Sequence, residues 1–158
     1  MSETRGERNR NPGNLDRTTI KWQGMSPDQS GDSRFVVFNT PEDGIRALAK
    51  VLLSYYRKHG LNTVRGIIDR WAPPVENDTG AYVAHVAKQL SVDPDAVIDP
   101  TKPEVLEVLT RAIIQHENGR NIFGLQHCQC FFHGEFMRGE GGDRECQYAR
   151  FQSYSYFG

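Results

Sequence analysis

The chain has 158 residues, of which 37% are apolar and 25% are charged, and its formal net charge is −1. This composition suits one globular domain, and the near-zero charge excludes a global field that would hold nucleic acid or anionic lipid. The first ten residues lack the apolar run of a signal peptide, and no stretch is long enough to span a bilayer. We therefore expect a protein made in the cytoplasm, with no nucleic-acid partner and no membrane insertion.

The first forty residues carry turn and strand signals. Residues 1–10 are predicted to be a flexible or loosely docked arm. The N-P-G-N sequence at residues 11–14 is a dense turn signal, because proline presets one dihedral angle and glycine permits a positive φ. Residues 17–22 and 34–38 are strand candidates on either side of a loop rich in Gly, Ser, Asp and Pro. Together they predict a small β-hairpin region.

Four later segments repeat apolar residues at helical spacing. The first starts at Thr40, where a capping hydroxyl precedes a proline at the first helical position and two acids in the first turn. The other helices are expected over residues 62–71, 79–90 and 101–118. The predicted fold class is therefore mainly α (α+β), a helical domain with a small β-hairpin region.

Residues 125–158 have no helical period, and their aromatic, glycine and charged residues are scattered. We interpret them as an irregular or poorly ordered tail, so the domain is predicted to span residues 11–124. The odd number of cysteines argues against a disulfide framework. The tail holds residues that suggest zinc, but their C-x-C spacing is not that of a C-x-x-C knuckle, so we predict no metal and no cofactor. They are His127, Cys128, Cys130, His133 and Cys146.

A stiff connection joins two of the predicted helices within residues 67–82. Trp71 ends an apolar stripe, and the two prolines that follow exclude further helix because proline lacks the amide hydrogen. Glu76 and Asp78 offer side-chain oxygens that can cap the next helix. An indole and two carboxylates are thus held between packed helices, where binding and catalysis concentrate in proteins. A helix stop followed by a good cap explains the same residues without any function.

Glu117 is the residue that we select as a general acid. It lies in the sequence A-I-I-Q-H-E-N-G, at the last turn of an apolar helix. The partial negative charge of a helix end disfavours a second negative charge, which helps a carboxyl group to keep a proton that it can donate. Gly119 behind it would let a substrate approach closely. The alternative is a solvated glutamate at a frayed helix end.

Glycoside hydrolysis generally uses a second carboxylate. We prefer Glu76, with Asp78 as the alternative, because the acids that follow Thr40 are already explained by their place in a first helical turn. Some aromatic side chains could stack on sugar rings, although aromatic residues on apolar stripes more often belong to the core. These candidates are Trp22, Trp71 and Tyr82.

Several stretches resemble a family of small phage and prophage proteins. Its members are commonly labelled virion structural proteins, and their domain is thought to be lysozyme-like. The run W-A-P-P-x-E-N-x-T-x-x-Y is the most specific part of the resemblance, which covers about residues 8–120. The resemblance implies a lysozyme-like domain that is virion-associated or delivered to the bacterial cell wall. The stretches are R-N-x-N-P-G-N-L (8–15), W-x-G (22–24), and residues 35–47, 60–82 and 112–119.

Two of these stretches are also similar to enzymes that cut the bacterial cell wall. N-P-G-N-L followed by F-x-x-F is similar to the N-x-F-G-I and F-x-x-Y pattern of cell-wall glucosaminidases, and A-I-I-Q-H-E-N-G is similar to the sequence around the catalytic glutamate of lytic transglycosylases. In those families the glutamate precedes the N-x-F-G-I element, whereas here it follows, which requires a permuted arrangement. The resemblance implies cleavage of peptidoglycan glycan strands, with Glu117 as the catalytic acid and Asn14 in substrate binding.

Two other functions stay open on this sequence. A non-catalytic virion structural or adaptor protein, with other virion proteins as its partners, is favoured because no recognisable catalytic pair occurs in family order. The other is an antibacterial cell-wall toxin delivered by a secretion machine, which a neighbouring immunity gene would indicate.

Overall fold

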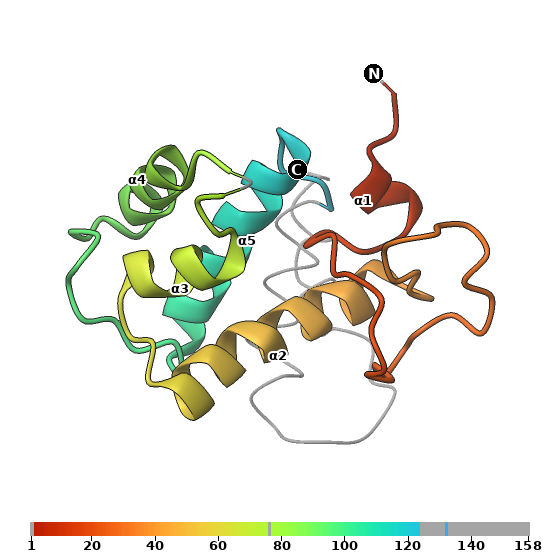
Figure 1. The fold of residues 1–158 in the computed structure, drawn as a ribbon, viewed down its shortest axis with the longest axis horizontal. Helices are drawn as coiled ribbons and strands as arrows, with labels where there is room; N and C mark the ends of the chain where they lie inside the picture. The colour runs from red at the N-terminus through yellow and green to blue at the C-terminus, as the bar shows by residue number, and fades with distance from the viewer. Residues whose placement is uncertain (1, 76, 124–131, 133–158) are drawn as a thin grey trace, which may run out of the picture.

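The computed structural model describes residues 2–75, 77–123 and 132. Within these residues the chain is mainly helical, which confirms the predicted mainly α fold class (Figure 1). None of the helices in this part of the chain is both long and apolar enough to cross a membrane. The helices are α1 (Arg5–Arg8), α2 (Pro41–His59), α3 (Val64–Trp71), α4 (Thr79–Leu90) and α5 (Pro103–Asn118).

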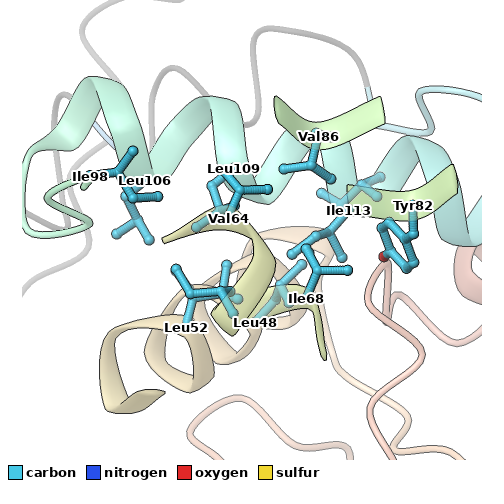
Figure 2. Packing of buried hydrophobic residues seen from close by; sticks show 14 of the residues in the cluster. Leu48, Leu52, Val64, Ile68, Tyr82, Val86, Ile98, Leu106, Leu109 and Ile113 are labelled. Atoms are coloured by element: carbon cyan, nitrogen blue, oxygen red, sulfur yellow. The ribbon is translucent and has the colours of Figure 1, made fainter. Parts of the chain in front are cut away.

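Helices α2, α3, α4 and α5 enclose the main hydrophobic core. Helix α5 packs against α4 and α2, and α3 packs against α4. In Figure 2, apolar side chains from all four helices point toward one another, and they include Leu48, Ile68, Val86 and Ile113. Each of these four side chains is fully buried. The spacing that predicts each helix therefore also places its apolar side chains in one shared core.

Capping residues set where the helices begin. The hydroxyl of Thr40 accepts a backbone N–H of the first turn of α2, as predicted. Helix α3 begins after Thr63, slightly later than predicted, because the Thr63 hydroxyl caps it by accepting a backbone N–H at 3.0 Å. Helix α5 begins at Pro103 rather than at residue 101, because the fixed φ and missing N–H of proline suit the first helical position.

The N-terminal segment is tied to the end of α5. Residues 1–10 are expected to be a flexible or loosely docked arm, but their described part contains α1, around which Thr4 and Glu7 form a capping box. The Thr4 hydroxyl also donates to Oδ1 of Asn118 at 3.1 Å, and Arg120 donates to Glu7 at 2.6 Å. Local capping and contacts from residues more than a hundred positions away therefore connect this segment to the helical domain.

Isolated β-bridges replace the predicted regular hairpin. Antiparallel bridges join Asp16 to Phe35 and Met25 to Phe38. Among the described residues these bridges do not extend into a strand. Phe35 and Phe38 belong to the second predicted strand, so that segment does take part in pairing. The first predicted strand, over residues 17–22, is wrong, since none of these residues forms a bridge.

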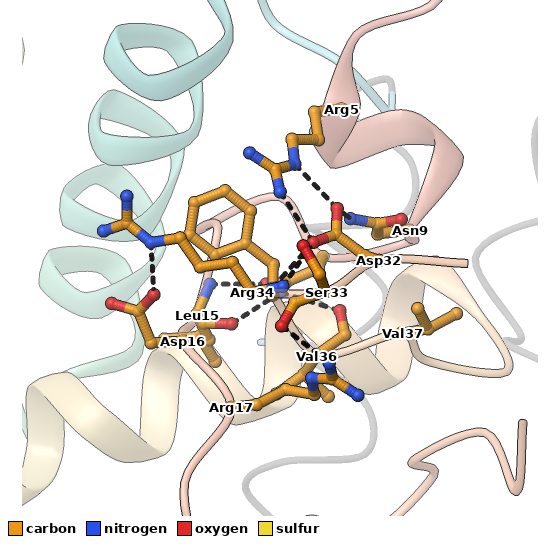
Figure 3. Close-up of polar contacts among 12 residues, drawn as sticks. Arg5, Asn9, Leu15, Asp16, Arg17, Asp32, Ser33, Arg34, Val36 and Val37 are labelled. Carbon is orange, nitrogen blue, oxygen red and sulfur yellow. Dashed lines mark hydrogen bonds and ion pairs between the residues drawn. The ribbon is translucent and has the colours of Figure 1, made fainter. Parts of the chain in front are cut away.

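Side chains form hydrogen bonds to backbone groups that would pair with a neighbouring strand in a longer hairpin. Asn11 is fully buried, and its Nδ2 donates to the carbonyl oxygens of Leu15 and Val36 at 3.0 and 2.9 Å. Its Oδ1 accepts the N–H of Leu15 at 2.9 Å. Asp32 is also buried and accepts two further backbone N–H groups (Figure 3). The turn signal of the sequence thus marks a polar network that holds an irregular layer together.

Replacing Gly44 with alanine is expected to destabilise the protein by about 1–3 kcal/mol. Gly44 is buried near the start of α2, and a Cβ there would collide with the carbonyl oxygen of Arg10 and with Cδ of Pro12. Denaturant unfolding of the variant measures the loss. Gly80→Ala is the matched control, because Gly80 is exposed near the start of α4 and a Cβ there meets only ordinary contact. A Gly44→Ala protein as stable as Gly80→Ala would contradict the close approach.

Candidate functional site

Three of the predicted site residues meet at one carboxylate oxygen. Glu117 lies in the last turn of α5, where it is half-buried. Its Oε1 accepts a hydrogen bond from Nε1 of Trp71 at 3.1 Å and another from the hydroxyl of Tyr82 at 3.2 Å. Trp71 ends α3 and Tyr82 lies in the first turn of α4. The ends of three helices therefore converge on Glu117.

The proline connection fixes the two donor residues relative to each other. Helix α3 stops at Trp71 and α4 covers Thr79–Leu90, as the sequence predicts. Between them, the buried hydroxyl of Thr79 donates to the carbonyl oxygen of Ala72 at 2.7 Å. Asp78 caps α4 by accepting the N–H of Ala81 at 3.1 Å. The connection is thus closed by hydrogen bonds at both ends, which limits its movement.

Trp71 is a junction between two parts of the molecule. Its indole packs against the main core and also against a second, smaller cluster under the irregular N-terminal layer. A Cβ at Gly13, in the N-P-G-N turn, would lie 3.4 Å from Cη2 of the indole. The neighbouring Asn118 donates to the carbonyl oxygen of Pro12 at 2.9 Å. The second cluster consists of Leu15, Val36, Phe38 and Ala47.

The N-P-G-N turn and Glu117 therefore lie on the same indole, although more than a hundred residues separate them in the sequence. The reversed chain order of these two elements does not separate them in space.

Tyr82 is a buried hydrogen-bond donor rather than an open sugar platform. The residue is 1% exposed, and its ring stacks on the imidazole of His116 with centroids 3.6 Å apart and an interplanar angle of 10°. Burial, reinforced by the nearby charge of Glu117, raises the pKa of the Tyr82 phenol well above its ordinary value. The phenol therefore keeps its proton. The expectation that this ring stacks on sugar is corrected, because the core and His116 already cover it.

His116 and His85 are site residues that the sequence did not reveal. Burial lowers the pKa of His116, and the negative charge of Glu117 opposes this effect. The ring of His85 is 5.9 Å from that of His116, and its Nε2 is buried without a hydrogen-bond partner in the described part of the chain. Tyr82 and His85 share one face of α4 because they are three positions apart. That spacing is the signal that could have placed both beside α5.

The remaining substrate-binding candidates lie in the N-terminal layer. Asn14 adopts a left-handed backbone with φ of 48°, and its buried Oδ1 has no hydrogen-bond partner among the described residues. It follows the glycine that faces Trp71, so it lies close to the junction. Trp22 is half-buried and packs against the second cluster. Sugar binding by Asn14 and Trp22 stays a prediction.

The candidates for a second carboxylate beside Glu117 are Asp78 and Glu76. Asp78 is exposed and serves as the cap of α4, and no hydrogen bond joins it to Glu117. Glu76, the preferred candidate, lies outside the described residues. The second carboxylate of the predicted catalytic pair therefore stays a prediction.

The described part of the chain holds no group of His, Cys, Asp and Glu side chains that could bind a metal ion. The histidines and cysteines that suggest zinc all lie in the tail, outside the described residues.

Comparison with known proteins gives one relationship at the level of sequence. No model of a protein family matches the chain. The chain is 40% identical over 123 residues to "Protein P5" of Pseudoalteromonas phage PM2, and the match covers 75% of this chain and 74% of the phage protein.

Proposed function

Because the chain belongs to the family of Protein P5 of Pseudoalteromonas phage PM2, we propose that it is a virion-associated protein with a structural or adaptor role. Its partners in this role are other virion proteins. The supporting observation is a match that covers about three quarters of both chains, so that it includes most of the described helical domain rather than one short motif. The resemblance to small phage and prophage proteins supports the same role.

The contacts of Glu117 agree with a purely structural role. A carboxylate that accepts from both Trp71 and Tyr82 joins the ends of three helices. Hydrogen bonds to a charged group typically contribute about 1.5–3 kcal/mol each. Glu117 therefore needs no catalytic function to account for its place in the fold.

Cleavage of peptidoglycan glycan strands is the second candidate, and one observation favours it. Glu117 is a half-buried carboxylate at the end of an apolar helix, and it shares the Trp71 indole with the N-P-G-N turn. In a lysozyme or lytic transglycosylase, such a group protonates the glycosidic oxygen while the bond to the anomeric carbon breaks. The resulting carboxylate then recovers a proton from the water or sugar hydroxyl that attacks this carbon. One carboxyl group can perform both steps.

A comparison of purified proteins on purified cell walls distinguishes the two candidates. If the protein cleaves glycan, the wild type clears the wall suspension and Glu117→Gln does not. Glu104→Gln is the matched control, because Glu104 is an exposed glutamate on the same helix. A wild type that leaves the walls intact but is present in purified particles at many copies supports the structural role alone. Equal clearing by wild type and Glu117→Gln would remove Glu117 from any mechanism.

A further inference from the structure

The two oxygens of the Glu117 carboxylate have different surroundings. Both hydrogen bonds, from Trp71 and from Tyr82, end on Oε1. Within the described part of the chain, no hydrogen bond ends on Oε2. A carboxylate in water exchanges its two oxygens freely by rotation, so this one-sided arrangement is a property of the fold.

The indole of Trp71 cannot change its role. The indole N–H of tryptophan can donate a hydrogen bond but cannot accept one. Oε1 must therefore stay an acceptor whenever its hydrogen bond from Trp71 is kept. The phenol of Tyr82 also keeps its proton, because burial raises its pKa. A protonated carboxyl group has one carbonyl oxygen and one hydroxyl oxygen. Because Oε1 accepts the N–H of Trp71 and the O–H of Tyr82, the carbonyl role belongs to Oε1 and the hydroxyl role to Oε2.

Both donors are held firmly by their surroundings. Trp71 is the last residue of α3 and packs between two hydrophobic clusters. Tyr82 is almost fully buried, and its ring lies against His116. Side chains that are locked by packing can hold a reactive group in one orientation, which is what proton transfer to a bound substrate requires.

We propose that Trp71 and Tyr82 are positioning residues that hold Oε1 of Glu117 as a fixed acceptor, so that Oε2 is the atom that gives and recovers the proton. This inference rests on the glycan-cleaving function proposed above. It assigns these two aromatic residues to the orientation of Glu117 rather than to sugar stacking. Neither residue touches the substrate in this scheme.

Two conservative variants of the full chain test the proposal. Trp71→Phe and Tyr82→Phe each remove one donor and keep an aromatic ring in the core. We expect each variant to lower kcat on soluble glycan fragments by about 10- to 100-fold, with KM nearly unchanged, because the carboxyl group is misoriented while binding is intact. Tyr55→Phe is the matched control, since Tyr55 is a half-buried tyrosine against the same core and its hydroxyl makes no hydrogen bond in the described part of the chain.

A second measurement tests the contact without any activity. The indole N–H proton of Trp71, observed by NMR, is expected to change its chemical shift in Glu117→Gln, because the substitution replaces the charged oxygen that accepts its hydrogen bond. Circular dichroism checks that each variant is folded. An indole N–H signal at the same position in folded wild type and folded Glu117→Gln would overturn the positioning role.

The kinetic outcomes separate this inference from the proposed function. Wild-type kcat in both phenylalanine variants would overturn the positioning role while the glycan-cleaving function stands. An increase in KM alone would also overturn it, because the two residues would then bind the substrate. A wild type that is inert on glycan contradicts the cleaving function itself, and with it the use of Oε2 in catalysis.

Discussion

Replacing Asp32 with asparagine is expected to destabilise the protein by about 3 kcal/mol. Asp32 is buried and accepts two hydrogen bonds from the Arg5 guanidinium, at 2.6 and 2.7 Å. It also accepts from Nδ2 of Asn9 at 2.7 Å and from the N–H groups of Arg34 and Phe35, each at 2.9 Å (Figure 3). The carboxylate is surrounded by donors, so an amide in its place must turn its own N–H₂ toward one of them.

The same cluster predicts a loss of stability in acid. The hydrogen bonds from Arg5, supported by backbone donors and Asn9, hold the pKa of Asp32 below its usual value of about 4. A carboxyl group whose pKa is lower in the folded than in the unfolded protein stabilises the fold fully above its unfolded pKa. This contribution is lost as the pH falls below about 4 toward the folded pKa. Glu7, whose pKa is lowered mainly by the N–H of Thr4, acts in the same direction.

Denaturant unfolding at several pH values measures both effects of Asp32. We expect Asp32→Asn to be less stable at neutral pH and to lose less additional stability in acid than the wild type. Asp16→Asn is the matched control, because the ion pair of Asp16 with Arg34 is exposed and contributes little. Equal stability of the two asparagine variants at neutral pH would show that the Asp32 cluster does not support the fold.

Replacing Asn11 with alanine is the second change with a large expected effect. The Asn11 amide is the partner of the N–H of Leu15 and of the carbonyl oxygen of Val36. Its removal leaves both groups buried without these hydrogen bonds, and each such loss costs about 1–3 kcal/mol. We therefore expect a total loss of about 2–6 kcal/mol, enough to release the N-terminal layer from the helices.

Hydrogen exchange, measured residue by residue, distinguishes local from global loss in Asn11→Ala. We expect protection to fall first at residues 15–38, while the amides of α3, α4 and α5 stay protected. Asn39→Ala is the matched control, because Asn39 is exposed and its side chain makes no hydrogen bond in the described part of the chain. If protection at residues 15–38 is unchanged in Asn11→Ala, the side chain does not replace the missing strand pairing.

The helices were predictable because their signals are local. Apolar spacing, a capping hydroxyl at Thr40 and the two prolines after Trp71 act within a few residues, and the structure places α2, α3 and α4 near the expected positions. The N-terminal layer was less predictable. There, the side chain of Asn11 bonds to the carbonyl oxygen of Val36, 25 positions further along the chain, and residues 17–22 form no bridge despite their composition.

The contacts among Glu117, Trp71 and Tyr82 depend on how three helices cross, which no local signal gives. Trp71 and Tyr82 lie on different helices, and both donate to Glu117. The apolar stripes of single helices suggest either a core position or sugar stacking for the two aromatic residues, and they do not reveal a hydrogen bond to Glu117. Only the crossing of α3, α4 and α5 turns their N–H and O–H groups toward one carboxylate oxygen. His116 was missed for the same reason, since its stacking partner Tyr82 belongs to a different helix.

The hydrogen bonds of Asn118 have a consequence for synthesis on the ribosome. This residue bonds to Thr4 and to Pro12, which precede it by 114 and 106 positions. The N-terminal layer is translated first, yet its partner at the end of α5 leaves the exit tunnel among the last of the described residues. Contacts between such distant positions form slowly, so the nascent layer stays accessible to chaperones and proteases until nearly the whole domain has emerged.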